Sequence, residues 1–282
     1  MTTFTGEVLA WGTPRLRDLP WRHTRDPWAV LVSEVMLQQT QVARVITRWH
    51  DFLARFPTPG ACAAAPLGEV LREWQGLGYP RRARNLHATA RRVTELGRFP
   101  SGLDDLLALP GVGPYTARAV MAFAFEVDAA VVDTNVARVL ARVTGERLTA
   151  RRAQALADDA SPVGDAWAWN QCLMDLGAVL CRPRAPRCGE CPVRARCAWR
   201  GDPTSPDPAV GSSGVSTPQA RFEGSDRQAR GRLMRALSHA PVERLAVRAV
   251  MERDRATADR LLATLVADGL CVVDAGEVRL PE

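Results

Sequence analysis

The sequence predicts an all-α protein that carries a cysteine-rich loop and a small additional module. Apolar residues recur at helical spacing through most of the first 200 positions, and no run there alternates with the period of a β-strand. Four of the seven cysteines fall between Cys181 and Cys197, which indicates a metal site. A stretch rich in proline and serine then separates this region from a final helical segment.

Each predicted helix is marked by apolar residues three or four positions apart, so that one face would be buried in a core. Asp26-Pro27 provides a start signal for the second of these segments. The segments are residues 8–9, 28–37, 42–56, 70–74, 103–109, 117–125 and 136–143.

The domain prediction follows the change in composition. Residues 1–200 form one helical domain, residues 201–225 form a linker, and residues 226–282 form a small module. In that module, helical patterning gives way to alternation around Asp274-Ala275-Gly276, which predicts a hairpin. A winged helix and a helical cap with a disordered tail both fit this pattern.

The composition favours an anionic partner and excludes one kind of chemistry. The formal net charge is +6, which suits nucleic acid. Every cation is arginine, so no lysine amine is present to act as a Schiff-base nucleophile. With neither an apolar run long enough for a membrane nor a secretory signal, we expect a cytoplasmic, nucleoid-associated protein that does not contact membranes.

The cysteine loop reads Cys181-x6-Cys188-x2-Cys191-x5-Cys197. Four thiolates in one loop can hold a single [4Fe–4S] cluster. Zinc is the alternative, although zinc ligands usually form two closely spaced pairs and only one close pair occurs here. Six arginines and one acid lie between residues 182 and 200, and these cations would offset the charge of a cluster.

Two carboxylates lie in contrasting sequence contexts. Glu34 is the only charge in the apolar run 29–37; if it faces inward, burial would raise its pKa and suit it to act as a general acid. The alternative is a place on the solvated edge of the helix. Asp133 ends an apolar run and precedes a helix, so we expect an N-cap that the local amides keep ionised.

A glycine turn lies in residues 109–117, between two predicted helices. Gly111 and Gly113 permit a tight turn, and the amides at the start of the following helix could hold a phosphate. A simple helix–turn–helix corner would give the same pattern.

In combination, these motifs resemble the A/G-specific adenine DNA glycosylases of the MutY type, within the endonuclease III superfamily. The resemblance rests on residues 33–42 (SEVMLQQTQV), with residues 19–22, 76–79, 111–115 and 132–136 in the same order, and covers about residues 4–200. It implies a helix-hairpin-helix glycosylase fold of two helical subdomains. The six-helix subdomain would span about residues 27–130, and the N-terminal helix with residues 131–200 would form the iron–sulfur subdomain. It also favours one [4Fe–4S] cluster over zinc.

The resemblance implies the chemistry of base excision. Glu34 would protonate the departing adenine, Asp133 would stabilise the sugar cation, and Tyr115 and Asn135 would order the active site. Relatives that also cut the strand carry lysine where Tyr115 stands, so we expect no efficient lyase step.

The DNA contacts are also implied by the resemblance. Gln39 and Tyr79 match residues that insert into the duplex beside the mismatch, and Trp21 and Arg22 match residues that line the adenine pocket. Taken without the resemblance, Trp21 could equally be core and Gln39 surface. The remaining residues expected to contact substrate or DNA are Leu37, Gln38, Leu77, Gly111 and Gly113.

We therefore expect a monomeric enzyme that removes adenine mispaired with 8-oxoguanine or guanine in double-stranded DNA. A thymine–guanine glycosylase of the same fold and a non-catalytic iron–sulfur DNA-binding regulator are the alternatives. Two features depart from the resemblance. Pro80 stands where a second aromatic is more usual, and residues 226–282 are too few for the Nudix-like domain that reads 8-oxoguanine in longer members.

Overall fold

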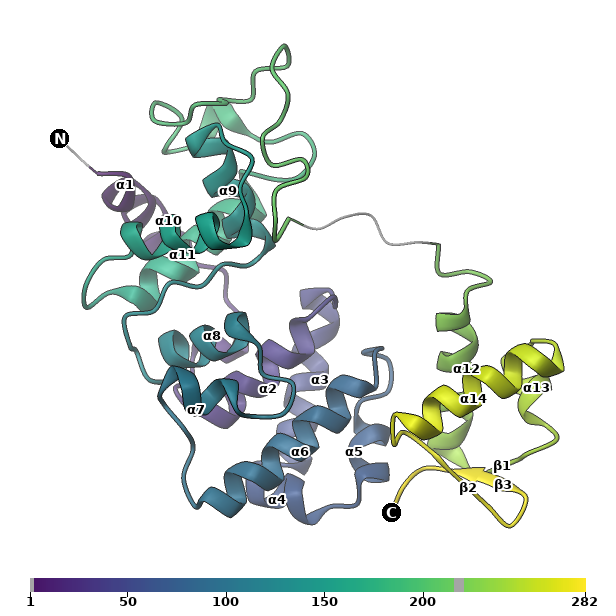
Figure 1. Ribbon diagram of the computed structural model, residues 1–282. Helices are drawn as coiled ribbons and strands as arrows, with labels where there is room; N and C mark the ends of the chain where they lie inside the picture. Colours follow the sequence, from purple (N-terminus) through teal and green to yellow (C-terminus); the bar gives the residue numbers. More distant parts are fainter. Residues whose placement is uncertain (1–2, 216–220) are drawn as a thin grey trace. The chain divides into compact units, whose positions relative to one another are not determined.

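The computed structural model describes residues 3–215 and 221–282, and it is mostly helical, as predicted (Figure 1). Part of the predicted linker, residues 216–220, lies outside the described residues. The helices are α1 (Phe4–Gly12), α2 (Pro27–Leu37), α3 (Val42–Arg55), α4 (Pro59–Ala64), α5 (Leu67–Glu73), α6 (Arg81–Leu96), α7 (Leu103–Leu107), α8 (Pro114–Ala124), α9 (Thr134–Thr144), α10 (Ala150–Ala160), α11 (Ala166–Val179), α12 (Asp226–His239), α13 (Val247–Met251) and α14 (Arg255–Ala267).

The described chain forms two compact units, and each is built from separated segments. The first contains residues 3–30, 101–107 and 112–215, and the second contains residues 31–100, 108–111 and 221–282. These units do not follow the boundaries expected from the sequence, because residues 112–130 group with α1 and the cysteine loop. None of the helices in the described ranges is long and apolar enough to cross a membrane.

The first unit is centred on α11, which contacts α1, α8 and α9. Trp169 of α11 is fully buried and meets the ring of Phe4 edge-on. Asn170, also buried, donates to the carbonyl of Ala129 at 2.9 Å and accepts from the amide of Val131 at 2.8 Å. This side chain supplies the hydrogen bonds that the extended segment before α9 would otherwise lack.

In the second unit, α3 and the end of α5 meet around aromatic side chains. The ring of Phe52 lies edge-on to those of Phe56 and Trp74, with centroids 5.0 and 6.0 Å apart. The buried residues Val45, Trp49 and Phe52 recur at helical spacing on α3 and make it amphipathic, so burial of one face favours its helical fold.

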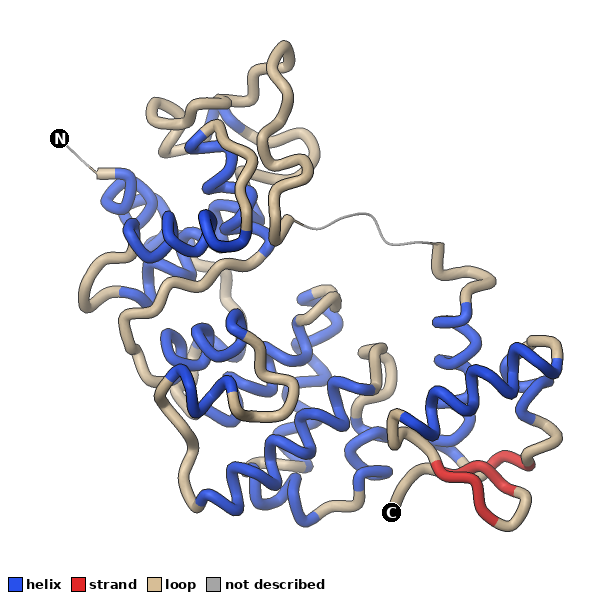
Figure 2. The backbone as a smooth tube through the Cα atoms, in the orientation of Figure 1, coloured by secondary structure: helices blue, strands red, loops and turns tan. Residues whose placement is uncertain are grey.

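The C-terminal module combines three helices with a small antiparallel sheet, which is the order of elements expected of the first of the two arrangements. It runs α12, β1 (Val242–Glu243), α13, α14, β2 (Val272–Asp274) and β3 (Glu277–Arg279). The antiparallel sheet has the order β1-β3-β2, with Val278 of β3 paired to both Val242 and Val273. Figure 2 shows the hairpin as the red segment near the C-terminus.

Several polar contacts attach this module to the rest of the second unit. Arg81 at the start of α6 makes two 2.6 Å hydrogen bonds to Asp268. The amide of Gly68 donates to the carbonyl of Pro281 at 2.9 Å. Gln75 donates to the carbonyl of Met234 at 3.2 Å.

The linker expected over residues 201–225 is folded up to residue 215, which corrects that expectation. Asp207 pairs with Arg142 at 2.6 Å, and Ser212 accepts a 2.9 Å hydrogen bond from the amide of Leu148. Ala209 is 2% exposed. The segment forms no helix or strand, so its sequence shows no periodicity. Hydrogen bonds to α9 and to residues 147–148 hold it in place instead.

A buried ion pair fixes the N-terminal loop against α11. Arg22 makes two 2.8 Å hydrogen bonds to Asp175, and Arg17 adds a third at 2.7 Å. Burial alone would raise the pKa of Asp175, but the bonds from Arg22 and Arg17 outweigh it and hold that pKa below its ordinary value.

Replacing Asp175 by Asn should therefore lower the free energy of unfolding by about 3–5 kcal/mol at pH 7, because it leaves Arg22 buried without its anion. The contribution of Asp175 is present above its unfolded-state pKa, about 3.9, and is lost as the pH falls through the lower folded-state value. Urea unfolding between pH 3 and 7 would measure both effects. Asp159→Asn, at an exposed site on α10, is the control, and equal stability of the two variants would contradict the prediction.

Candidate functional site

The N-terminus of α9 presents a carboxylate that is fixed on both oxygens. Asp133 is the N-cap, as predicted, and its Oδ1 accepts from the amides of Asn135 at 2.9 Å and Val136 at 2.7 Å. Its Oδ2 accepts from the side-chain amide of Asn135 at 2.8 Å. The orientation of this carboxylate is therefore set by the helix and by Asn135 together.

The charge of Asp133 is set by opposing effects. Burial raises its pKa, whereas the hydrogen bonds from Val136 and Asn135 and the charge of Arg138 lower it; burial prevails, and the pKa lies above its ordinary value. The sequence prediction considered only the amides, which favour the anion. A desolvated carboxylate of this kind interacts strongly with a nearby cation.

Arg138 connects this carboxylate to the cysteine loop. It donates to Oδ1 of Asn135 at 2.8 Å, to the carbonyl of Gly177 at 2.7 Å and to that of Cys181 at 2.7 Å. Sequence analysis missed Arg138; the only local signal was a cation within the apolar pattern of α9. Gly177 matters because a Cβ there would lie 2.6 Å from Cβ of Asn135 and 2.9 Å from its carbonyl oxygen.

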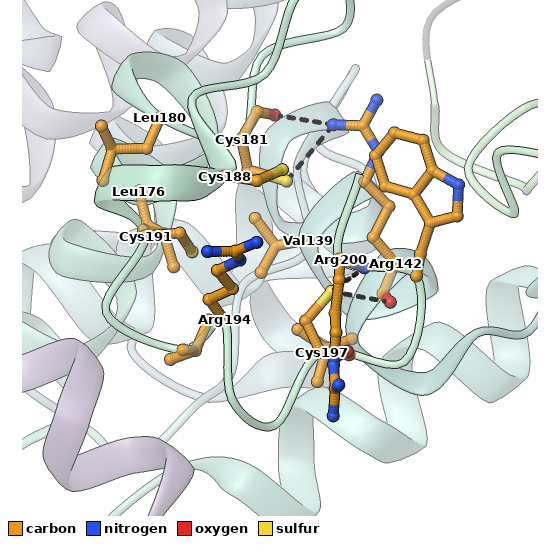
Figure 3. Close-up of a pocket in the computed structure, with 13 residues that line it drawn as sticks. Val139, Arg142, Leu176, Leu180, Cys181, Cys188, Cys191, Arg194, Cys197 and Arg200 are labelled. Carbon is orange, nitrogen blue, oxygen red and sulfur yellow. Dashed lines mark hydrogen bonds between the residues drawn. The ribbon is translucent and has the colours of Figure 1, made fainter. Parts of the chain in front are cut away.

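The four predicted cysteines line one pocket, together with apolar side chains from α9 and α11 (Figure 3). Arg142 donates to Sγ of Cys181 at 3.3 Å, and the amide of Arg200 donates to Sγ of Cys197 at 3.3 Å. A Cβ at Gly201 would come within 2.7 Å of Sγ of Cys188. The loop therefore brings the four thiols to one place and directs N–H donors at two of them.

The loop offers four thiols, which are the donors that either a [4Fe–4S] cluster or a zinc ion would take. Among the described residues, no group of three His, Cys, Asp or Glu side chains is arranged to hold one metal ion. Burial raises the pKa of the Cys191 thiol to about 11, so ligation by its thiolate requires a cation that offsets this desolvation.

Glu34 lies on α2 and is 4% exposed, which settles the sequence alternatives in favour of an inward-facing side chain. Its neighbours Leu31 and Met36 are fully buried. The start of α2 is secured by Asp26, which accepts from the amide of Trp28 at 3.0 Å. The carboxyl group of Glu34 is thus largely shielded from solvent, which is one of the conditions that the sequence reasoning set for a general acid.

Two loops of the second unit are held together by Arg82, which sequence analysis also missed. It donates to the carbonyl of Gln38 at 2.6 Å and to those of Leu77 and Gly78 at 2.8 and 3.0 Å. Further bonds reach the carbonyls of residues 35 and 36 at the end of α2. Burial lowers the pKa of Arg82 to about 10, which leaves it charged at neutral pH.

The two loops joined by Arg82 carry Gln39 and Tyr79, the residues expected to insert into the duplex. Gln39 is exposed and Tyr79 is 38% exposed, and both adopt the left-handed backbone region, with φ of 56° and 48°. Leu37 and Gln38 are half-buried, whereas Leu77 is buried and supports its loop. A strained backbone at two exposed residues, in loops that are themselves held in place, is typical of a site that contacts a ligand.

The hairpin between α7 and α8 has the expected form. Gly111 is in the left-handed region at φ 74°, and a Cβ there would meet Cβ of Asn85 at 2.7 Å. Thr89 donates to the carbonyl of Pro110 at 2.8 Å. Gly113 is the N-cap of α8, and Tyr115 is half-buried in its first turn.

Of the predicted pocket residues, Trp21 and Arg22 are both buried. The terminal nitrogens of Arg22 are engaged by Asp175 and by the carbonyl of Arg17. Arg22 thus has a clear role in the fold, and its contact with a base stays a prediction.

The structure places the predicted site residues in both units and brings Asp133 and Asn135 into direct contact. The four cysteines, Trp21, Arg22, Gly113 and Tyr115 belong with them to the first unit. The second unit contains Glu34, Leu37, Gln38, Gln39, Leu77, Tyr79 and Gly111.

Residues 32–161 match the family described as HhH-GPD superfamily base excision DNA repair protein. Among solved structures, a thermostable thymine-DNA glycosylase is 33% identical with a TM-score of 0.67, over 70% of this chain and 95% of that one. A non-covalent endonuclease III–DNA complex gives 26% identity and a TM-score of 0.61, over 68% of this chain and 92% of that one.

Curated relatives extend the similarity over most of the chain. The adenine DNA glycosylase of Mycobacterium tuberculosis is 43% identical over 93% of this chain and 88% of its own length. That of Mycolicibacterium smegmatis is 43% identical over 94% and 91%. The human adenine DNA glycosylase is 43% identical over 71% of this chain and 40% of its own. The chain belongs to the adenine DNA glycosylase family, within the HhH-GPD superfamily of base excision repair proteins.

Proposed function

We propose that this enzyme binds duplex DNA as a monomer and hydrolyses the N-glycosidic bond of adenine mispaired with 8-oxoguanine or guanine. The observation that carries the proposal is the carboxylate of Asp133, which is held on both oxygens at the start of α9 in a chain of this family. Glu34, the second carboxyl group expected to act, is 4% exposed on α2.

The two groups suit the two demands of base excision. Adenine leaves poorly unless a ring nitrogen is protonated, and the carboxyl of Glu34 is the proton donor. The sugar develops oxocarbenium character, which the Asp133 carboxylate stabilises by its charge. Asn135 and Arg138 keep that carboxylate in place, and Glu34, once deprotonated, helps to position the attacking water.

Single-turnover excision of adenine should be fastest opposite 8-oxoguanine, then guanine, and slow opposite cytosine. Glu34→Gln should slow excision by about 10²–10⁴-fold, because it removes the general acid, and should leave DNA affinity nearly unchanged. Glu95→Gln, at an exposed site on α6, is the matched control.

Three results would contradict this assignment. Equal excision rates for Glu34→Gln and the control would show that Glu34 is not the general acid. Release only of thymine from thymine–guanine pairs would identify the rival glycosylase. No release from any duplex by protein with an intact cysteine-loop cofactor would favour a DNA-binding regulator.

We also propose that the enzyme lacks an efficient lyase step, since Tyr115 follows the hairpin and the chain has no lysine. The product strand should stay intact until it is treated with alkali, and borohydride should trap no protein–DNA adduct. A strand-cutting relative that carries the lysine provides the positive control. Efficient trapping of this protein would overturn the proposal.

The four cysteines of the loop are proposed to hold one [4Fe–4S] cluster. The cluster would support the fold and contribute charge, and it would take no part in breaking the N-glycosidic bond. Arg142 donates to Cys181, and six arginines against one acid occur within residues 182–200, so cations are available to compensate the negative charge of four thiolates.

Purified protein should absorb broadly in the violet and contain iron. Cys191→Ser should remove most of the iron and the absorbance and should lower the melting temperature, because metal binding stabilises the folded loop. Cys62→Ala, at a buried cysteine of α4 outside the loop, should retain both. Stoichiometric zinc without iron would show that the loop binds zinc and not an iron–sulfur cluster.

A further inference from the structure

We propose that Phe222 and Arg227 of the C-terminal module and Tyr79 form one surface that stacks against an unpaired base beside the mismatch. We name these three residues the stacking surface. The inference rests on the proposed action on duplex DNA, and it assigns to the module a role in substrate contact.

The three side chains are directly linked. Nη1 of Arg227 donates to the hydroxyl of Tyr79 at 3.1 Å, and the guanidinium carbon of Arg227 lies 5.4 Å from the ring centroid of Phe222. On the other side, the guanidinium of Arg82 lies 5.6 Å from the ring of Tyr79. Arginine groups and aromatic rings therefore alternate from the loop clamped by Arg82 to the module.

Phe222 is 53% exposed, and hydrogen bonds connect its turn to the start of α12. The amide of Ser225 donates to the carbonyl of Phe222 at 3.1 Å, and the hydroxyl of Ser225 caps α12 by accepting from the amide of Gln228. Gln228 in turn accepts from the amide of Gly224 at 2.8 Å. An exposed ring on a fixed turn loses little entropy when it binds a flat partner.

The charges of α12 favour a nucleic acid as that partner. The helix carries Arg227, Arg230, Arg232 and Arg235 against one acid of its own, Asp226, which is paired with Arg260 at 2.7 Å; of these arginines, Arg232 is paired with Glu252 at 2.6 Å. Aromatic rings beside cations are the usual surface on which unstacked bases lie.

Helix α14 of the same module is less suited to contact DNA. Its Arg255 and Arg260 are within ion-pairing distance of Asp259 and Asp226, respectively, and Asp268, just beyond its end, is bound by Arg81. The contact with DNA is therefore assigned to the start of α12.

The test measures dissociation constants of the full chain for a duplex with a non-hydrolysable adenosine analogue opposite 8-oxoguanine, and for the fully paired duplex. Phe222→Ala should weaken binding to the mismatched duplex about tenfold, with little change for the paired one. Phe222→Tyr should bind like the wild type. Leu245→Ala is the matched control, because Leu245 is an 85% exposed apolar residue elsewhere on the module.

Arg227→Gln tests whether the three residues act as one surface. Its effect on mismatch binding should not add to that of Phe222→Ala in the double variant, because each change disrupts the same contact. Additive effects, or equal affinities of Phe222→Ala and Leu245→Ala for the mismatched duplex, would overturn the inference. Since binding is measured without excision, wild-type protein that releases no adenine would contradict the proposed function alone. Melting curves confirm that each variant is folded.

Discussion

Multiple hydrogen bonds from individual arginine side chains hold the functional loops of this protein in place. Arg82 joins the loops before α3 and α6, Arg138 joins the start of α9 to α11 and the cysteine loop, and Arg22 holds the N-terminal loop on α11. A guanidinium group has five N–H donors in one plane, so it can satisfy several carbonyl groups that belong to different segments. A lysine amine has three donors and a single charged centre, and could not replace these contacts.

This arrangement explains how short loops keep strained or desolvated groups in position. Gln39 and Tyr79 adopt left-handed backbone angles, and Asp133 is an acid whose burial opposes its ionisation. Each of these states costs free energy and persists because neighbouring contacts determine the geometry. In the C-terminal module, Arg227 makes a comparable contact with Tyr79.

The sequence predicted what depends on local patterns. Helices α1–α3, α5 and α7–α9, the capping role of Asp133 and the glycine turn followed from spacing and residue type, whereas the predicted segments did not include α4, α6, α10 or α11. The density of cysteines predicted that they would lie together. The sequence did not reveal Arg82 and Arg138, because their partners are mainly backbone carbonyls that carry no residue-specific signal. The folded state of residues 201–215 was missed for the same reason, since contacts such as Arg142 with Asp207 join positions far apart in the chain. For Glu34, the apolar run in the sequence left two alternatives open, an inward-facing side chain and a place on the solvated edge of the helix.

Gly177 shows how such a site depends on a residue that does no chemistry. The backbone of Asn135 leaves no space for a Cβ on that part of α11, and backbone atoms cannot move aside as the end of a flexible side chain can. The addition of one methyl group would push away the residue that orients Asp133. Natural selection should therefore tolerate variation at Gly177 as little as at the carboxylate itself. Surveys of inherited variants that weigh only the loss of reactive groups would overlook this position.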